Sequence, residues 1–162
     1  MSPLHTLLKE LKLLKGRGKV TSVLKLCQAG RLVGGLSVSL HALPDEVLGP
    51  LVHVLGPEAK ALRIEDSFGT RPMQLHVRCG DLFEKWEVED VAGLIHNIND
   101  LFKARPGVNL MLVLGEWEDM LQILSVRKEQ ARRLLESRLV DCVNQRAVMQ
   151  ILEPREEEQG GY

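Results

Sequence analysis

The chain has 162 residues, of which 44% are hydrophobic and 27% are charged, and its formal net charge is −1 at pH 7. This is the composition of an ordinary globular domain, and it argues against a wholly disordered chain. The three cysteines, Cys27, Cys79 and Cys142, are odd in number and far apart, and no apolar run approaches the length of a membrane span. We therefore expect a cytoplasmic protein with reduced thiols.

Residues 3–15 predict an amphipathic helix, because leucines recur at helical spacing while lysines fall largely on the other faces. The leucines are Leu4, Leu7, Leu8, Leu11 and Leu14, and the lysines are Lys9, Lys12 and Lys15. Gly16 and Gly18 end this helix. Residues 1–40 hold seven basic side chains and one acidic one, a net charge of +6, so the remaining residues sum to −7. This polarity favours self-association or a charged partner.

Residues 20–27 and 32–40 predict two strands, because both runs are rich in β-branched and aliphatic residues and a glycine-containing turn separates them. Gly34 and Gly35 in the second run indicate a bulge or the close approach of another backbone. Pro44 and Asp45 open a short helix that reaches Leu55, and Pro50 predicts a kink inside it.

Residues 60–67, 73–79 and 82–88 predict three strands joined by turn residues, and residues 90–103 predict an amphipathic helix. Residues 108–114 are almost entirely apolar, which predicts a strand buried on both faces, and residues 120–126 pair back with it. From Arg127 a helix is predicted to about residue 146, and residues 147–152 are either its last turns or an added strand. Residues 153–162 are acidic and then glycine-rich, which is typical of a flexible tail.

The predicted element order is α-β-β-α-β-β-β-α-β-β-α. Its short hairpin links favour an α+β fold, with a mostly antiparallel sheet and helices packed on it. No Pro/Gly/Ser-rich linker divides the chain, so residues 1–152 are expected to form a single domain.

The order of the predicted elements resembles that of two known families. Over residues 3–104, the order α-β-β-α-β-β-β-α is similar to that of roadblock/longin modules, which are dimeric adaptors on GTPase pathways. Over residues 44–146, the order α-β-β-β-α-β-β-α is similar to that of the small dimeric chaperones of type III secretion. Both resemblances imply a dimerising interaction module without catalytic chemistry.

The first candidate partner-binding segment is basic and comprises Lys9, Lys12, Lys15, Arg17 and Lys19. It does not match a phosphate-binding loop, because Val20 stands where that motif needs Ser or Thr and the segment follows a helix instead of a strand. Its cations would attract nucleic-acid phosphates, so a nucleic-acid-associated protein is an alternative function. Residues 1–40 hold no aromatic side chain on which a single strand would stack.

Two tryptophans stand among carboxylates, Trp86 within residues 84–90 and Trp117 within residues 116–119. Because Trp is favoured at binding hot spots, Trp86 and Trp117 are a second group of candidate partner-binding residues. If the two acidic clusters met in space, they would instead raise a carboxyl pKa for acid–base work or hold a hard cation. The remaining interpretation is plain packing at strand ends.

No catalytic, metal-binding or cofactor-binding residue is predicted, and no cofactor. His76 and Cys79 fall on opposite faces of a strand, so they do not form a dyad or a ligand pair. The other histidines show no metal-ligand spacing. The sequence therefore favours a non-catalytic protein–protein interaction module, adaptor-like or chaperone-like and homodimeric. The alternatives are a nucleic-acid-associated protein and a small enzyme of unknown reaction.

Overall fold

The computed structural model describes residue 9, residues 21–138 and residues 140–153. The predicted helix over residues 3–15 lies almost wholly outside the described residues, as does the tail from residue 154 onward. Of that segment only Lys9 is described, and it is helical and exposed.

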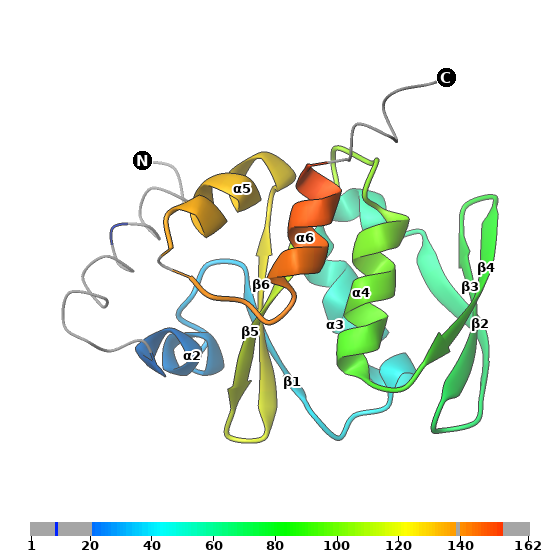
Figure 1. The fold of residues 1–162 in the computed structure, drawn as a ribbon. Coiled ribbons are helices and arrows are strands. Elements are labelled where there is room, and N and C mark those ends of the chain that lie inside the picture. Colours follow the sequence, from blue (N-terminus) through cyan, green and yellow to red (C-terminus); the bar gives the residue numbers. More distant parts are fainter. Residues whose placement is uncertain (1–8, 10–20, 139, 154–162) are drawn as a thin grey trace.

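Along the described part of the chain, helices alternate with one single strand and two runs of consecutive strands (Figure 1). In chain order they are α2 (Thr21–Gln28), β1 (Gly35–Ser39), α3 (Pro44–Leu55), η1 (Pro57–Ala59), β2 (Leu62–Phe68), β3 (Met73–Cys79), β4 (Leu82–Val88), α4 (Val91–Leu101), β5 (Leu110–Trp117), β6 (Met120–Val126), α5 (Lys128–Glu136) and α6 (Gln145–Leu152). The predicted α+β class with antiparallel pairing is confirmed. Four elements, α3, β3, β4 and β6, have the predicted bounds, and α3 retains Pro50 inside it.

The described strands form two three-stranded antiparallel sheets, whereas the sequence predicts one. The first sheet has the order β1-β6-β5 and the second the order β2-β3-β4. Helices α3 and α4 lie between the two sheets and contact both, while α2, α5 and α6 pack on the side of the first sheet away from α3 and α4 (Figure 1). The face of the second sheet that points away from the helices is the outermost layer of the molecule on that side.

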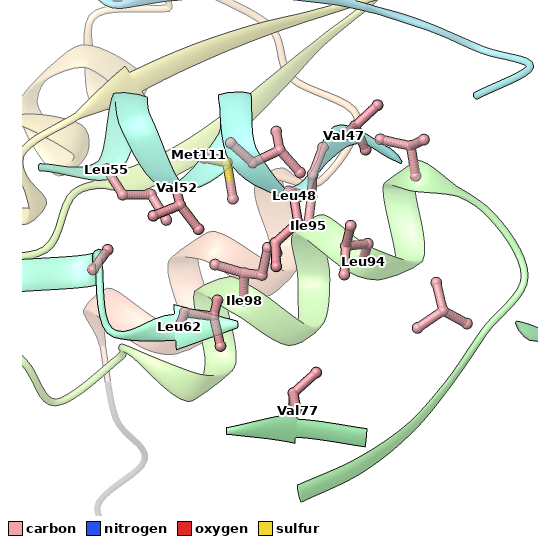
Figure 2. Packing of buried hydrophobic residues seen from close by; sticks show 14 of the residues in the cluster. Val47, Leu48, Val52, Leu55, Leu62, Val77, Leu94, Ile95, Ile98 and Met111 are labelled. Atoms are coloured by element: carbon pink, nitrogen blue, oxygen red, sulfur yellow. The ribbon is translucent and has the colours of Figure 1, made fainter. Parts of the chain in front are cut away.

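The space between the two sheets is filled by aliphatic side chains from both helices and both sheets. Leu94, Ile95 and Ile98 of α4 are fully buried and point toward α3, toward Val77 of β3 and toward Met111 of β5 (Figure 2). Burying each such side chain is worth about 1.5–3 kcal/mol, so this shared core holds the two sheets together.

The segment of residues 20–27 is a helix, and the predicted strand there is wrong. Val23, Leu24 and Cys27 share one face of α2 and pack against the first sheet, while Lys25 is exposed. The Cys27 thiol lies 3.5 Å from the carbonyl oxygen of Ile123 on β6. The order that resembled roadblock/longin modules therefore loses its first strand. The order over residues 44–136, α-β-β-β-α-β-β-α, is formed as predicted.

The long helix predicted from Arg127 to about residue 146 is two helices. α5 ends at Glu136, and Arg138 has a positive φ of 58°. The following segment then bonds to β5: the Val143 amide donates to the Val113 carbonyl at 2.7 Å, and the Asn144 side chain accepts from the Val113 amide at 2.9 Å. These bonds hold the chain away from helical geometry until α6 begins, so residues 147–152 are helical.

The close backbone approach indicated by Gly34 is present. Gly34 has a φ of +82° and exchanges backbone contacts with Ser125 of β6, whose amide donates to the Gly34 carbonyl at 2.8 Å. A Cβ at this position would lie 2.5 Å from the Ser125 carbonyl oxygen.

Along the described residues, none of the helices is both long and apolar enough to cross a bilayer.

Candidate functional site

The outward face of the β2-β3-β4 sheet carries the most distinctive group of exposed side chains. Side chains alternate along β3, so Met73, Leu75, Val77 and Cys79 point to the helices while Gln74, His76 and Arg78 point outward. β4 pairs with β3 in unbroken register, which places Phe83 opposite Arg78 and Glu87 opposite Gln74 on the same outward face.

Three rings meet at the centre of this face. His76 lies between Phe68 of β2 and Phe83 of β4, with ring centroids 5.3 Å and 5.8 Å apart in edge-on geometry. The Arg78 guanidinium stands 5.3 Å from the centroid of the Phe83 ring, a cation–π distance. We call Phe68, His76, Arg78 and Phe83 the aromatic face. Phe68 and Phe83 remain 50% and 41% exposed, so packing within the molecule leaves much of both rings available.

Charges of both signs surround the aromatic face. The basic residues are Arg63, Arg78 and Lys85, and the acidic residues are Glu65, Asp66 and Glu87. The Arg78 Nε donates a hydrogen bond of 2.6 Å to Glu65, which lowers the pKa of that carboxyl group and keeps it ionised. Three basic and three acidic side chains balance, so the Lys, Arg, Asp and Glu residues of this face carry no net formal charge beside its exposed rings.

Trp86, one of the two predicted tryptophans, belongs to the same sheet but to its inward side. Its side chain is 7% exposed and packs in the core shared with α4. The indole Nε1 donates a hydrogen bond of 2.8 Å to Glu84, so the buried polar atom is satisfied. The strand that carries Trp86, β4, is an edge strand: among the described elements it pairs with β3 on one side and with no strand on the other.

Trp117 lies in the other sheet, at the end of β5, and is half-buried beside the turn formed by Glu118 and Asp119. The β5–β6 hairpin and β4 lie on opposite sides of the molecule (Figure 1). The two acidic clusters therefore do not meet, and the acid–base and cation sites that needed their proximity are not formed. Of the basic candidate segment, Lys9 is exposed, and Lys12, Lys15, Arg17 and Lys19 lie outside the described residues.

The histidine and thiol geometry follows the strand pattern. Cys79 is buried on the inward face and His76 lies on the outward face, as predicted. Burial raises the pKa of the Cys27 thiol. Within the residues that the structure describes, His, Cys, Asp and Glu side chains form no group of three or more that would hold a metal ion.

Cys142 is expected to react slowly with alkylating agents. Burial, aided by the nearby Asp141 carboxylate, raises its pKa to about 11. Below that pKa only the minor thiolate form reacts, so at pH 8 alkylation by iodoacetamide should be at least about tenfold slower than for free N-acetylcysteine. Its rate should keep rising with pH beyond the point where the free thiol levels off. Peptide mapping of quenched samples measures each thiol separately, and a plateau near pH 8 would contradict the assigned environment.

Comparisons of the chain with known protein families, with characterised proteins and with solved structures find no match.

The aromatic face is not among the candidate sites that the sequence predicts. The alternation of side chains along the predicted strands β3 and β4 is enough to place His76, Arg78 and Phe83 on one side of the sheet. The position of Phe68 on that side follows only from the irregular pairing of β2.

Proposed function

We propose that this chain is a non-catalytic protein–protein interaction module of the cytoplasm that self-associates, and that the aromatic face is the surface on which it binds a protein partner. The observation that carries this proposal is the pair of half-exposed phenylalanines on an otherwise polar, charge-balanced sheet face. Exposed aromatic side chains beside an arginine are the residue types that dominate the binding energy of protein interfaces.

The charge of the aromatic face favours a protein over a nucleic acid. Platforms that stack single strands combine their aromatic side chains with a basic groove that follows the phosphates. Here Glu65 already pairs with Arg78, and Glu87 accepts a hydrogen bond from Gln74 at 3.1 Å. The acidic groups would repel phosphates, whereas a protein surface with charges of both signs complements them.

Replacing both phenylalanines by serine should strongly weaken partner binding while the fold is retained. A photoreactive benzoylphenylalanine at position 83 first captures the partner, which is identified and then purified for calorimetry. We expect the Phe68→Ser/Phe83→Ser variant to bind this purified partner at least about tenfold more weakly than the wild type. Its unfolding free energy should change by less than about 1 kcal/mol, because both rings are half-exposed.

Val143→Ser is the matched control, since Val143 is 77% exposed and lies outside the second sheet. It removes an exposed apolar side chain and should leave partner affinity unchanged. The proposal is contradicted if position 83 yields no protein adduct, or if the double variant binds as well as the wild type. Fluorescence anisotropy with a labelled single-stranded oligonucleotide at low salt tests the alternative, and binding that the double variant loses would support a nucleic-acid ligand instead.

A further inference from the structure

The two sheets have four lateral edges, and the edge of β5 is covered by asparagine side chains. Asn99 of α4 exchanges two hydrogen bonds of 3.0 Å with the backbone of Met111, donating from Nδ2 and accepting at Oδ1. The Asn144 side chain makes a second pair of hydrogen bonds with β5. Its Oδ1 accepts from the Val113 amide, and its Nδ2 donates to the Met111 carbonyl. This edge therefore offers little to another strand.

Two further edges are poor templates for strand pairing. β1 has only five residues, and α2 packs beside it. β2 is interrupted by a bulge between Ile64 and Asp66, which distorts the ladder that a new strand would have to follow. Short strands and bulges are devices by which proteins protect their sheet edges.

The edge of β4 has none of these features. Its seven residues pair with β3 without a register shift, and no described residue bonds the backbone on its other side. The two-residue turn Gly80-Asp81 makes Cys79 and Leu82 the closing pair of the hairpin. Hydrogen-bonded pairs alternate along an antiparallel ladder, so Phe83, Lys85 and Glu87 direct their amide and carbonyl groups away from β3.

Among the registers that pair more than half of the seven residues of β4, the charges along this edge select one for a second copy. A two-fold axis perpendicular to the sheet keeps the outward side chains of both copies on the same face of the extended sheet. Residues that lie opposite each other on the two β4 strands must therefore point to the same face. Centring the pair on Trp86 places Lys85 opposite the partner's Glu87, and the symmetry repeats this contact. Centring it on Lys85 opposes two lysines, and centring it on Glu84 opposes two glutamates. Like charges directly opposed destabilise a sheet.

We propose that two copies of this chain pair antiparallel through β4, in the register centred on Trp86, to form a continuous six-stranded sheet. The inference rests on the proposed self-association and names its surface. In this arrangement the outward-pointing backbone groups of Lys85 and Glu87 are paired, and the two indoles lie opposite each other on the inward side. The two aromatic faces then lie on the same side of the extended sheet.

Reversal of the charges tests the register. Lys85→Glu alone opposes two glutamates at both symmetric contacts, and Glu87→Lys alone opposes two lysines. Sedimentation velocity over a dilution series should show dimers of each single variant at least about tenfold weaker than those of the wild type. The double variant Lys85→Glu/Glu87→Lys restores both pairs and should dimerise like the wild type. An equimolar mixture of the two single variants should form a heterodimer, because each contact then joins opposite charges.

Lys60→Glu is the control, an equal change of charge on an exposed residue outside the sheets. It should leave the dimer unchanged, and circular dichroism should show that all variants fold. A wild type that stays monomeric at the highest concentration would overturn both the inference and the proposed self-association. A dimer that the single reversals leave intact, or that the double reversal does not restore, would overturn the β4 register alone.

Discussion

Replacing Gly34 by alanine is expected to lower the free energy of unfolding by about 3 kcal/mol or more. Two costs add at this position. A φ of +82° is unfavourable for a residue with a Cβ, at about 1–2 kcal/mol. The new Cβ would also lie 2.5 Å from the Ser125 carbonyl oxygen, which is backbone and cannot turn aside. Relief of that overlap must move β1 or β6, which strains the first sheet.

Gly30→Ala separates the two costs of the Gly34 substitution. Gly30 has a similar φ of +73°, and a Cβ there meets nothing within 4 Å. Urea unfolding of the two variants should therefore show a loss of about 1–2 kcal/mol for Gly30→Ala and a clearly larger loss for Gly34→Ala. Equal losses would mean that the contact with Ser125 is not the cause.

The second large effect is expected for Asn99→Leu, at about 2–4 kcal/mol of unfolding free energy. Asn99 is 4% exposed and is the described partner of the Met111 amide, while the Met111 carbonyl also accepts from Asn144. Leucine has similar size but no hydrogen-bonding groups, so the substitution leaves a buried amide unsatisfied at the cost of its full desolvation.

Asn97→Leu is the matched control on the same helix, because Asn97 is only half-buried and the exchange of residue types is identical. Its effect on urea unfolding should stay within about 1 kcal/mol. Hydrogen exchange gives a second readout, since the Met111 amide should exchange faster in the Asn99 variant. Unchanged protection of that amide would show that the bidentate pairing does not stabilise β5.

The strands that were predicted well are those whose pattern is strong locally. β3 alternates buried and half-buried residues over its whole length, and turn residues stand on both sides of it. The segment of residues 20–27 shows where such reasoning fails. Its exposed Lys25 and buried Cys27 stand two residues apart, which puts them on opposite sides of a helix but would put them on the same face of a strand. A run of eight residues is too short for the sequence alone to reveal which of these patterns it follows. In the structure the buried side of the helix packs against the first sheet.

The candidate site depends on pairing that the sequence does not reveal. Without the bulge between Ile64 and Asp66, continuing the register from Ile64 and Val77 would place Phe68 opposite Met73, on the inward face. The bulge shifts this pairing by one residue and turns Phe68 outward, opposite Gln74, where its ring meets His76. One extra residue in a strand therefore determines whether the aromatic face exists, and composition and spacing carry no sign of it.

The pairing of β1 with β6 also has a consequence for the order in which the molecule folds. β2, β3 and β4 follow one another through short turns, and β5 and β6 form a hairpin. β1 instead joins the first sheet through partners such as Ser39 and Met120, which lie more than 80 residues apart along the chain. Contacts between distant residues carry a larger loop-closure entropy than hairpins do. We therefore expect the hairpins to form early and β1 to dock late, after most of the chain between its ends has become ordered.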